Sequence, residues 1–364
     1  MQVKFLDVAS INRRYRRQFS DALSDTLEDG QFILGSGVEK FEQQFSRYTG
    51  LKYTVGVGNG LDALTILLRS VGIGHGDEVI VASNTYIATW LAISNVSAIP
   101  IPVEPDEMFN LDPSRVEEKI TSQTKAILVT HLYGRLANME ELARLSEKYK
   151  LFLFEDAAQA HGARESYGQA GSLSHGAAYS FYPGKNLGAI GDGGAVTTNH
   201  REIYTKAVAL RNYGSSTKYY NHTKGMNSRL DEFQARVLSI KLQDLDKDNK
   251  HRNEIASIYY NELKQIPQIK LPKPSLSGEH VWHLYTILTK QRDDLRDYLA
   301  LNAIETLIHY PIPPHAQDAY AEFNHLDFPI SEEIHMTTLS LPISPVLSHN
   351  EAMYVCNCIK AYFE

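Results

Sequence analysis

The feature that most constrains the fold is an alternation of short apolar runs with amphipathic segments between about residues 51 and 200. The apolar runs are YTVGVGN, DEVIVAS, KAILVTHLYG, LFLFED and GGAVTTN, and the segments between them include GLDALTILLRSVG, TYIATWLAISNVS and NMEELARLSEKYK. Strands that alternate with helices of about 10–15 residues form right-handed crossovers and parallel sheets that are covered on both faces. The pattern therefore predicts an α/β fold around a mostly parallel central sheet.

The pattern changes beyond residue 230. A charged segment over about 229–264 predicts one long helix, and the remainder, beginning HVWHLYTIL, predicts a smaller α+β module. A length of 364 residues suits one large domain and one smaller domain. We therefore expect an N-terminal segment at 1–30, whose helix at about 12–29 packs near the small domain, a large domain at 31–250 and a C-terminal domain at 251–364.

The composition narrows the possible partners. The chain has a formal net charge of -7, with 43% hydrophobic and 22% charged residues. This balance gives no basic face for a phosphate backbone, so we expect no nucleic-acid partner. No run approaches the ~18 apolar residues of a membrane span, and the first residues carry charges where a signal peptide needs an apolar run. We expect a cytoplasmic protein with no membrane partner.

Asp156 is the first candidate for chemistry. It closes the strand-like run LFLFED, which small residues follow. Ligands of open parallel sheets bind beyond the carboxyl ends of the strands, so an acid there is well placed to act on one. Because side chains alternate along a strand, only one of Glu155 and Asp156 can face such a site. For Asp156 alone, a cap on the next helix is an equally open interpretation.

Lys185 is the second candidate. It lies in GAAYSFYPGKNLGAIGDGGAV, where repeated glycines indicate tight turns or close approach to a ligand. Its aromatic and apolar neighbours favour burial, which lowers the pKa of an ammonium group towards the nucleophilic free amine. Pyridoxal 5'-phosphate (PLP) needs a lysine for a Schiff base and a carboxylate that keeps its pyridine nitrogen protonated. Together, Lys185 and Asp156 predict a PLP enzyme in which both are catalytic.

The run VGVGNGLDAL predicts an anion site. A strand ends near Asn59, which is a good N-cap for a helix that begins at Gly60. Free N–H groups at such a helix start, including those of Gly60 and Leu61, can bind the phosphate of PLP. Because Leu61 follows Gly60, the glycines do not form the dinucleotide motif G-x-G-x-x-G. A plain capped helix is the alternative at this position.

The motifs NGLDAL, SNTYIATW, FEDAAQAHG, SFYPGKNLGAIGDGGA and GMNSRLDEFQA together resemble the DegT/DnrJ/EryC1 family of PLP-dependent sugar aminotransferases, in family order over nearly the whole chain. The resemblance implies the PLP-dependent transferase fold type I, a homodimer with shared active sites, and amination of nucleotide-linked keto sugars. It implies that Lys185 forms the Schiff base and that Asp156 is the partner of the ring nitrogen. The other cofactor contacts that it implies are Asn59, Gly60 and Leu61 at the phosphate, Tyr86 on the ring, Gln159 near the ring hydroxyl, Ser180 at the phosphate, and Asn227 from the other subunit.

Two details narrow this resemblance. Lys185 follows Tyr182-Pro183-Gly184, where the family commonly has a small polar residue, and the phosphate loop is Asn59-Gly60-Leu61-Asp62 instead of a Ser-Gly-Thr type. This combination resembles the members that aminate C3 of a dTDP-linked 3-keto-6-deoxyhexose, with L-glutamate as the expected amino donor. The alternatives are amination at C4, a sugar dehydratase of the same family, which lacks the lysine, and a non-catalytic sensor on the same fold.

Two polar segments are candidates for substrate binding. In and beside the long connection 212–228, Tyr219 and Tyr220 can stack on a base, and Lys218, Lys224 or Arg229 can meet a pyrophosphate; a mobile solvated loop is the alternative. The segment LIHYPIPPHAQDAY contains His309, Tyr310 and His315, which the family places near the sugar nucleotide, and Tyr182 is a further candidate.

Histidine pairs can also indicate a metal site. His309 and His315 have no third ligand of matching spacing, so we expect no metal there. His283, in HVWHLYTIL, fits a core position as well as a site position.

Overall fold

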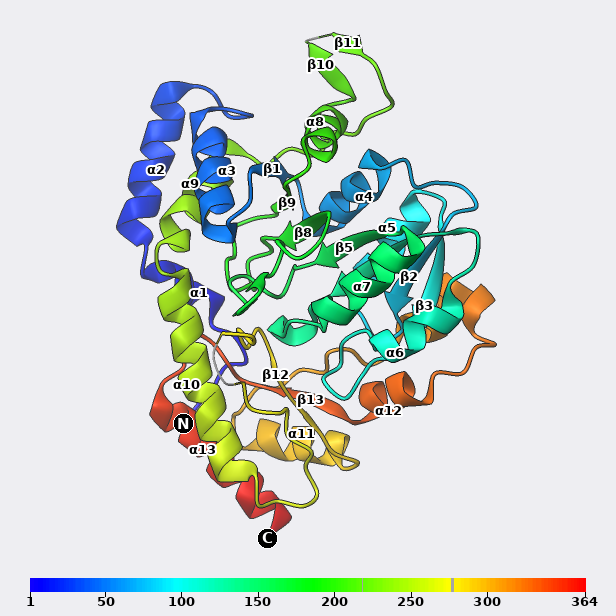
Figure 1. Ribbon diagram of the computed structural model, residues 1–364. Helices are drawn as coiled ribbons and strands as arrows, with labels where there is room; N and C mark the ends of the chain where they lie inside the picture. The colour runs from blue at the N-terminus through cyan, green and yellow to red at the C-terminus, as the bar shows by residue number, and fades with distance from the viewer. Residues whose placement is uncertain (218, 276–277) are drawn as a thin grey trace.

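The computed structural model describes residues 1–217, 219–275 and 278–364, so the prediction for Lys218 lies outside the described residues. A seven-stranded sheet forms its centre, in the order β1-β9-β8-β5-β4-β2-β3 (Figure 1). The strands β2, β3, β4, β5 and β8 are parallel, whereas β9 pairs antiparallel with β8 and with β1. The predicted α/β fold with a mostly parallel central sheet is confirmed. The bounds are β1 Tyr53–Val57, β2 Glu78–Ala82, β3 Ile99–Val103, β4 Thr124–Thr130, β5 Phe152–Asp156, β8 Gly176–Ser180 and β9 Gly194–Thr198.

Helices cover both faces of this sheet. Along β4, Ala126 and Leu128 belong to one core cluster and Ile127 and Val129 to another, as the alternation of side chains requires. Helices α4, α5 and α8 pack into the first cluster, and α6 and α7 into the second, while α3 and α9 cover β8 and β9. Their bounds are α3 Ser36–Thr49, α4 Gly60–Ser70, α5 Ile87–Asn95, α6 Pro113–Val116, α7 Met139–Tyr149, α8 Arg201–Leu210 and α9 Glu232–Leu242.

A second, smaller core lies below the sheet in the view of Figure 1. Ile255, Ile287, Leu295 and Val355 are completely buried in it. They come from α10 Leu245–Leu263, β12 Tyr285–Leu288, α11 Arg292–Leu301 and α13 His349–Phe363, and β12 pairs antiparallel with β13 Thr338–Leu341. The remaining elements are α12 Pro329–Thr337, the short 3-10 helices Glu117–Lys119, Leu132–Gly134, Pro314–Ala316 and Asp318–Phe323, and the small hairpins β6 Arg164–Glu165 with β7 Gly168–Gln169 and β10 Ser215–Thr217 with β11 Tyr220–Asn221.

Two expected helices are each interrupted. The segment predicted as one helix over about 229–264 forms α9 and α10, with Asp244 between them at φ -104° and ψ -1°. The helix expected at about 12–29 forms α1 Val8–Arg13 and α2 Arg16–Asp29. The two interruptions touch each other, because the hydroxyl of Tyr15 donates to Asp244 at 3.0 Å. Each segment predicted as one helix is therefore two helices, divided near Tyr15 and near Asp244.

The N-terminal segment touches both parts of the chain. Val3 is completely buried in the smaller core and forms a parallel bridge with Ile304, whereas α2 packs against α9. The domain limits at residues 30 and 250 therefore stay a prediction. Within the described residues, no helix is long and apolar enough to cross a membrane.

Candidate active site

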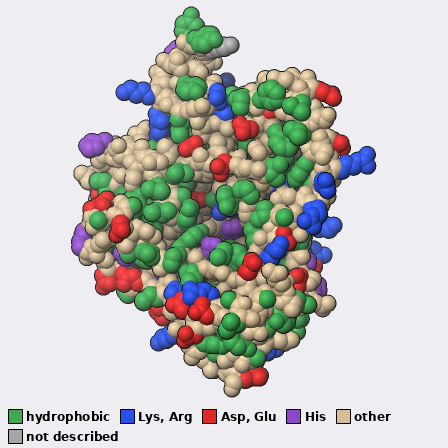
Figure 2. All heavy atoms as spheres, turned by 180° about the vertical axis from the view of Figure 1, so that it is seen from behind, with side chains coloured by type: hydrophobic (Ala, Val, Ile, Leu, Met, Phe, Trp, Pro, Cys, Tyr) green, Lys and Arg blue, Asp and Glu red, His purple; other side chains and the backbone are tan. Residues whose placement is uncertain are grey.

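A cavity of about 1430 Å³ lies at the carboxyl ends of β4, β5 and β8, whose last residues Thr130, Asp156 and Ser180 line it. Figure 2 shows a hollow near the middle of one face, with histidine side chains inside it. Most of the predicted site residues share this cavity. Those that line it are Asn59, Gly60, Leu61, Tyr86, Asp156, Gln159, Ser180, Tyr182, Lys185, His309 and Tyr310.

Asp156 is held by two donors at the end of β5. The hydroxyl of Thr89, in α5, donates to its Oδ2 at 2.8 Å, and the N–H of Ala158 donates to its Oδ1 at 3.1 Å. Burial raises the pKa of Asp156, while these hydrogen bonds and the positive charge of Lys185 act in the opposite direction. A cation bound against this carboxylate would be favoured by the same geometry.

Glu155, the neighbouring acid, belongs to the opposite face. Its carboxylate accepts from the N–H of Gly171 at 2.6 Å, the N–H of Leu173 at 2.9 Å and the hydroxyl of Ser174 at 2.8 Å. A bond of 2.8 Å joins it to Nε2 of His131. Glu155 therefore fixes the connection before β8, and of the two acids only Asp156 lines the cavity.

Lys185 lies in the connection that follows β8. Burial lowers the pKa of its ammonium group to about 8, although the charge of Asp156 opposes this shift. The connection turns back on itself, since the N–H of Lys185 donates to the carbonyl of Tyr182 at 2.8 Å. Gly188 permits the turn, because a Cβ there would lie 2.5 Å from the carbonyl oxygen of Pro183. The lysine side chain is thus held at the cavity in a form that is readily deprotonated.

The start of α4 offers unpaired donors to the same cavity. The side chain of Asn59 accepts from the N–H of Asp62 at 2.8 Å and caps the helix as predicted. The N–H groups of Gly60 and Leu61 donate to no other described residue. Ser180 packs directly against this turn, because a Cβ on Gly60 would lie 2.6 Å from Cβ of Ser180. The geometry is that of a helix-start anion site with a hydroxyl beside it.

Gln159 links the two parts of the chain across the cavity. Its Oε1 accepts from the N–H of Tyr133 at 2.6 Å, and its Nε2 donates to the hydroxyl of Tyr310 at 3.0 Å. The ring of Tyr310 lies 4.9 Å from that of Tyr86, centroid to centroid, with an interplanar angle of 34°. Tyr86 is 49% exposed, and its side chain makes no capping hydrogen bond to α5. Its ring lines the open space of the cavity.

Several side chains at the site carry no sequence signal that separates them from ordinary core residues. Thr89 looks like one of many helix hydroxyls, and its link to Asp156 depends on how α5 packs on β5. His283 lines the cavity, and its Nδ1 lies 3.1 Å from Oδ1 of Asn186, beside Lys185 in the chain. Burial lowers the pKa of His283 well below its usual value, so it is neutral at this position.

Six predicted residues do not line the cavity of their own chain, among them Lys224, which is exposed. Tyr219 and Tyr220 lie on the hairpin of β10 and β11, which projects from the top of the molecule in Figure 1, and they are 85% and 66% exposed. Asn227 is exposed and forms an antiparallel β-bridge with Asn212. The side-chain oxygen of Asn212 accepts a hydrogen bond from Arg229 at 3.1 Å. His315 is buried, with its Nε2 3.2 Å from the carboxylate of Glu332. Their roles stay predictions.

The cavity has the features that PLP requires. Unpaired amides at a helix start suit its phosphate, a buried carboxylate suits its protonated ring nitrogen, and a lysine with a lowered pKa suits covalent attachment. The residues that would hold the group are Gly60, Leu61 and Ser180 at the phosphate, Asp156 at the ring nitrogen, and Lys185 at the aldehyde carbon.

Comparison with known proteins agrees with this geometry. The model of the DegT/DnrJ/EryC1/StrS aminotransferase family matches residues 14–360. A dTDP-3-amino-3,6-dideoxy-alpha-D-galactopyranose transaminase of Aneurinibacillus thermoaerophilus is 53% identical over 361 residues, 99% of each chain. A dTDP-3-amino-3,4,6-trideoxy-alpha-D-glucose transaminase of Streptomyces venezuelae is 46% identical over 366 residues, 100% of this chain and 97% of the relative.

The likeness extends to solved structures. The crystal structure of DesV from Streptomyces venezuelae matches with a TM-score of 0.97 at 45% identity, covering 100% of this chain and 99% of DesV. The crystal structure of NtdA from Bacillus subtilis with bound cofactor PMP also matches, with a TM-score of 0.94 at 30% identity, covering 100% of this chain and 85% of NtdA. These matches confirm the predicted family, fold and cofactor. The chain belongs to the DegT/DnrJ/EryC1/StrS aminotransferase family and is an aminotransferase that depends on PLP.

Proposed function

We propose that this enzyme transfers an amino group to C3 of a dTDP-linked 3-keto-6-deoxyhexose, with L-glutamate as the amino donor. The observation that carries the proposal is the shared cavity of Lys185 and Asp156, together with relatives at 53% and 46% identity whose names specify 3-amino dTDP sugars. The two relatives differ in the sugar they are named for, one galacto and one trideoxy-gluco. The proposal therefore commits to C3 and leaves the presence and configuration of a hydroxyl at C4 to experiment.

In this proposal each of the residues Lys185, Asp156 and Thr89 has a separate role. Bound PLP supplies an electron sink for the carbanion that forms at the donor carbon. Nζ of Lys185 takes the proton from that carbon and returns it at the next position, which a pKa near 8 permits close to neutral pH. Asp156 holds a positive charge at the ring nitrogen, and Thr89 keeps the carboxylate in place.

The sugar would occupy the open part of the cavity. Tyr182 is 61% exposed and lines it, so its ring is available to a substrate. His309 and Tyr310, from the C-terminal part of the chain, also line the cavity. Burial lowers the pKa of His309 to about 4, so near neutral pH this imidazole is uncharged and acts as a hydrogen-bond partner for sugar hydroxyls.

We further infer a cytoplasmic homodimer with shared active sites. Asn227, Tyr219 and Tyr220 lie outside the cavity of their own chain, and the two tyrosines project on a hairpin. A second copy would place these side chains at the partner's cavity, where Asn227 would meet the phosphate and the tyrosines the nucleotide. The exposure of the hairpin supports this arrangement, since large aromatic side chains in such a position suit a ligand or a partner.

Two alternatives differ in chemistry. A dehydratase of the same family lacks the Schiff-base lysine, and Lys185 lines the cavity here, which favours amino transfer. Amination at C4 uses the same residues on another carbon, so only the product separates it from the proposal.

The test is an assay of the purified enzyme against dTDP- and UDP-linked 3-keto and 4-keto sugars with L-glutamate. The expected product is a dTDP-3-amino-6-deoxyhexose, identified by mass and by the chemical shift of the proton on the aminated carbon. Exclusive formation of a 4-amino product would overturn the assignment to C3. Turnover of UDP sugars alone would overturn the assignment of the nucleotide.

A further inference from the structure

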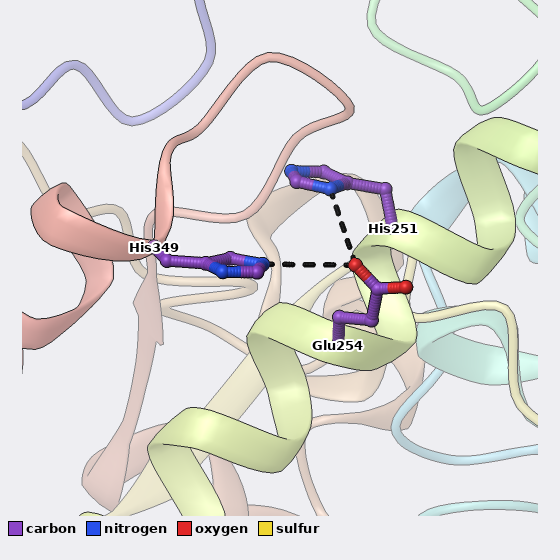
Figure 3. Close-up of side chains that lie close together, drawn as sticks. All are labelled: His251, Glu254 and His349. Atoms are coloured by element: carbon purple, nitrogen blue, oxygen red, sulfur yellow. Dashed lines mark ion pairs between the residues drawn. The ribbon is translucent and has the colours of Figure 1, made fainter.

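Two histidines and a glutamate meet on the surface, away from the cavity of Lys185. His251 and Glu254 lie one turn apart on α10, and His349 is the first residue of α13. Figure 3 shows both imidazole rings beside the same carboxylate oxygen of Glu254, with dashed lines that mark the ion pairs from each ring to that oxygen. Nδ1 of His251 lies 3.7 Å from that Oε2, and Nε2 of His349 lies 3.6 Å from it. None of the three residues lines the cavity.

Hydrogen bonding does not account for this arrangement. Both nitrogen–oxygen distances exceed the 2.7–3.2 Å of an N–H···O hydrogen bond. Nε2 of His251 is engaged elsewhere, because it lies 2.7 Å from the carbonyl oxygen of Leu347. A carbonyl can only accept, so the proton of the neutral ring is on Nε2 and the lone pair is on Nδ1, the atom that lies 3.7 Å from Glu254. Metal-binding histidines are commonly oriented by a carbonyl in this way.

The spacing suits one shared ion. The three ligand atoms lie within 4.8 Å of one another. The two rings are parallel, with an interplanar angle of 6° and 5.7 Å between their centroids, so at least one ring has to turn before both nitrogens point at one ion. Around a tetrahedral Zn²⁺ with bonds of about 2.0–2.1 Å, ligand atoms are separated by roughly 3.4 Å. The two distances to Glu254 exceed this by only a few tenths of an ångström. Coordination would therefore need rotation of at least one imidazole ring, in addition to small shifts of the ligand atoms.

We propose that His251, Glu254 and His349 form a binding site for a divalent transition-metal ion of the Zn²⁺ type, with water in the fourth position. Two imidazoles and one carboxylate favour Zn²⁺, Ni²⁺ or Cu²⁺ over Mg²⁺ and Ca²⁺, which prefer oxygen ligands throughout. The site is open to solvent, because Glu254 and His349 are exposed and His251 is partly buried. This proposal is independent of the amino-transfer reaction.

The ion would connect two helices of the smaller core. α10 and α13 already pack together through buried residues that include Ile255, Val355 and Ile359. An ion bound to the N-terminal residue of α13 and to the middle of α10 would link the two helices at the exposed edge of their contact. Because the unfolded chain does not hold the three ligands together, binding would stabilise the folded protein.

The experiment uses tag-free holoenzyme that has been treated with EDTA and desalted. Zn²⁺ is titrated by isothermal titration calorimetry, and thermal unfolding is measured with and without Zn²⁺. We expect one ion per chain and a higher melting temperature with Zn²⁺, and no such change with Mg²⁺. In His349→Gln and in Glu254→Gln the affinity should fall by about tenfold or more, since each removes one of three protein ligands. His75→Ala removes another exposed histidine and should bind as the wild type does.

The variants are designed to preserve the fold. His349 follows the cap residue Ser348, whose reciprocal bonds with Glu351 remain in place when His349 is changed. Equal melting temperatures in EDTA would show that the variants fold. Unchanged binding of one Zn²⁺ by His349→Gln and Glu254→Gln would overturn the proposal by assigning the ion to other ligands. Absence of saturable binding by the wild type at roughly 100 µM Zn²⁺ would also overturn it.

Discussion

The hydroxyl of Thr89 donates a hydrogen bond of 2.8 Å to the carboxylate of Asp156, from the first turns of α5 to the end of β5. A hydroxyl network continues behind it, because Thr85 lies 3.0 Å from Thr89 and 2.9 Å from Thr130, oxygen to oxygen. The acid that we propose for the cofactor ring is thus fixed by neutral donors, which hold its position without neutralising its charge.

The first prediction concerns Thr89→Val, which keeps the shape of the side chain and removes the hydroxyl. Loss of one hydrogen bond to a charged group costs about 1.5–3 kcal/mol, so the half-reaction with L-glutamate should slow by roughly tenfold or more. Rapid-mixing absorbance measures this rate. Thr85→Val is the matched control, since its hydroxyl does not contact Asp156, and it should slow the reaction less. An equal effect of both changes would show that packing, not the bond to Asp156, is responsible.

The second prediction concerns Lys185→Ala. The change removes both the amine that attaches the cofactor and the base that moves the proton, so turnover should fall by about three orders of magnitude or more. Borohydride reduction followed by peptide mass analysis should find PLP attached to Lys185 in the wild type. The control is Lys241→Met, which removes another lysine whose pKa burial lowers to about 8 but which does not line the cavity. Label on Lys241, or near-normal turnover of Lys185→Ala, would contradict the assignment.

The third prediction concerns pH. Burial lowers the pKa of Lys185 to about 8 in the protein without cofactor, and only the neutral amine attacks an aldehyde. Below pH 8 the ammonium form dominates, so the rate of covalent PLP uptake should rise about tenfold per pH unit. Above pH 8 the rate should level off, because the amine is already neutral. Stopped-flow absorbance of apoenzyme mixed with PLP gives the profile. A rate that still rises beyond pH 10 would indicate a solvated lysine.

Much of the fold follows from the sequence, because strand and helix periods are local. The prediction of strands β1, β2, β4, β5 and β9 rests on apolar, β-branched runs, and the structure has a strand at each of them. β3 carries Pro100 and Pro102, which count against a strand. The two prolines are tolerated because β3 is an edge strand, which pairs within the sheet with β2 alone. Edge position is a property of the whole sheet, which no local pattern contains.

The site residues likewise fall into those that the sequence predicts and those that it does not. Lys185 and Asp156 could be named because a lysine among glycines and an acid at a strand end together meet the needs of PLP. Thr89 and Asn186 could not, because their partners come from other elements and their residue types are common. His349 shows the limit most clearly. It lies far along the chain from His251 and Glu254, and only the packing of α13 on α10 brings the three together.

The fourth prediction tests shared active sites by mixing subunits. Lys185→Ala and Asn227→Asp, which places a negative charge opposite the cofactor phosphate, should each have little activity alone. If Asn227 serves the partner's cavity, every mixed dimer contains one intact site. Random reassortment of equal amounts would then restore about a quarter of the wild-type activity, since half of the dimers are mixed and each has one good site of two.

The control for this experiment is a mixture of Lys185→Ala with Asp156→Asn. Both changes lie in the same cavity, so a mixed dimer would contain no intact site and activity should stay low. Failure of the first mixture to gain activity, with mixed dimers detected by native mass spectrometry, would show that Asn227 does not serve the partner's cavity. An active monomer at low concentration would contradict the dimer itself.

The last prediction concerns Asp156→Asn, which separates the electronic role of this residue from its role in holding the cofactor. The amide keeps the size of the side chain but removes the charge that keeps the ring nitrogen protonated. PLP should still bind, because Gly60, Leu61, Ser180 and Lys185 are unchanged. The half-reaction with L-glutamate should slow by two powers of ten or more, about 3 kcal/mol of transition-state stabilisation. Rapid-mixing absorbance gives the rate, and the absorbance of the denatured cofactor gives the PLP content.

Glu155→Gln is the matched control, because it makes the same chemical change at the adjacent residue. Its carboxylate accepts from Gly171, Leu173 and Ser174 and meets His131, all away from the cavity. An amide can accept with only one of its two terminal atoms, so this change should lower the melting temperature and leave the rate per bound PLP near that of the wild type. A normal rate in Asp156→Asn together with a slow rate in Glu155→Gln would reverse the two roles. That outcome would require β5 to be shifted by one residue, so that Glu155 and not Asp156 faced the cofactor.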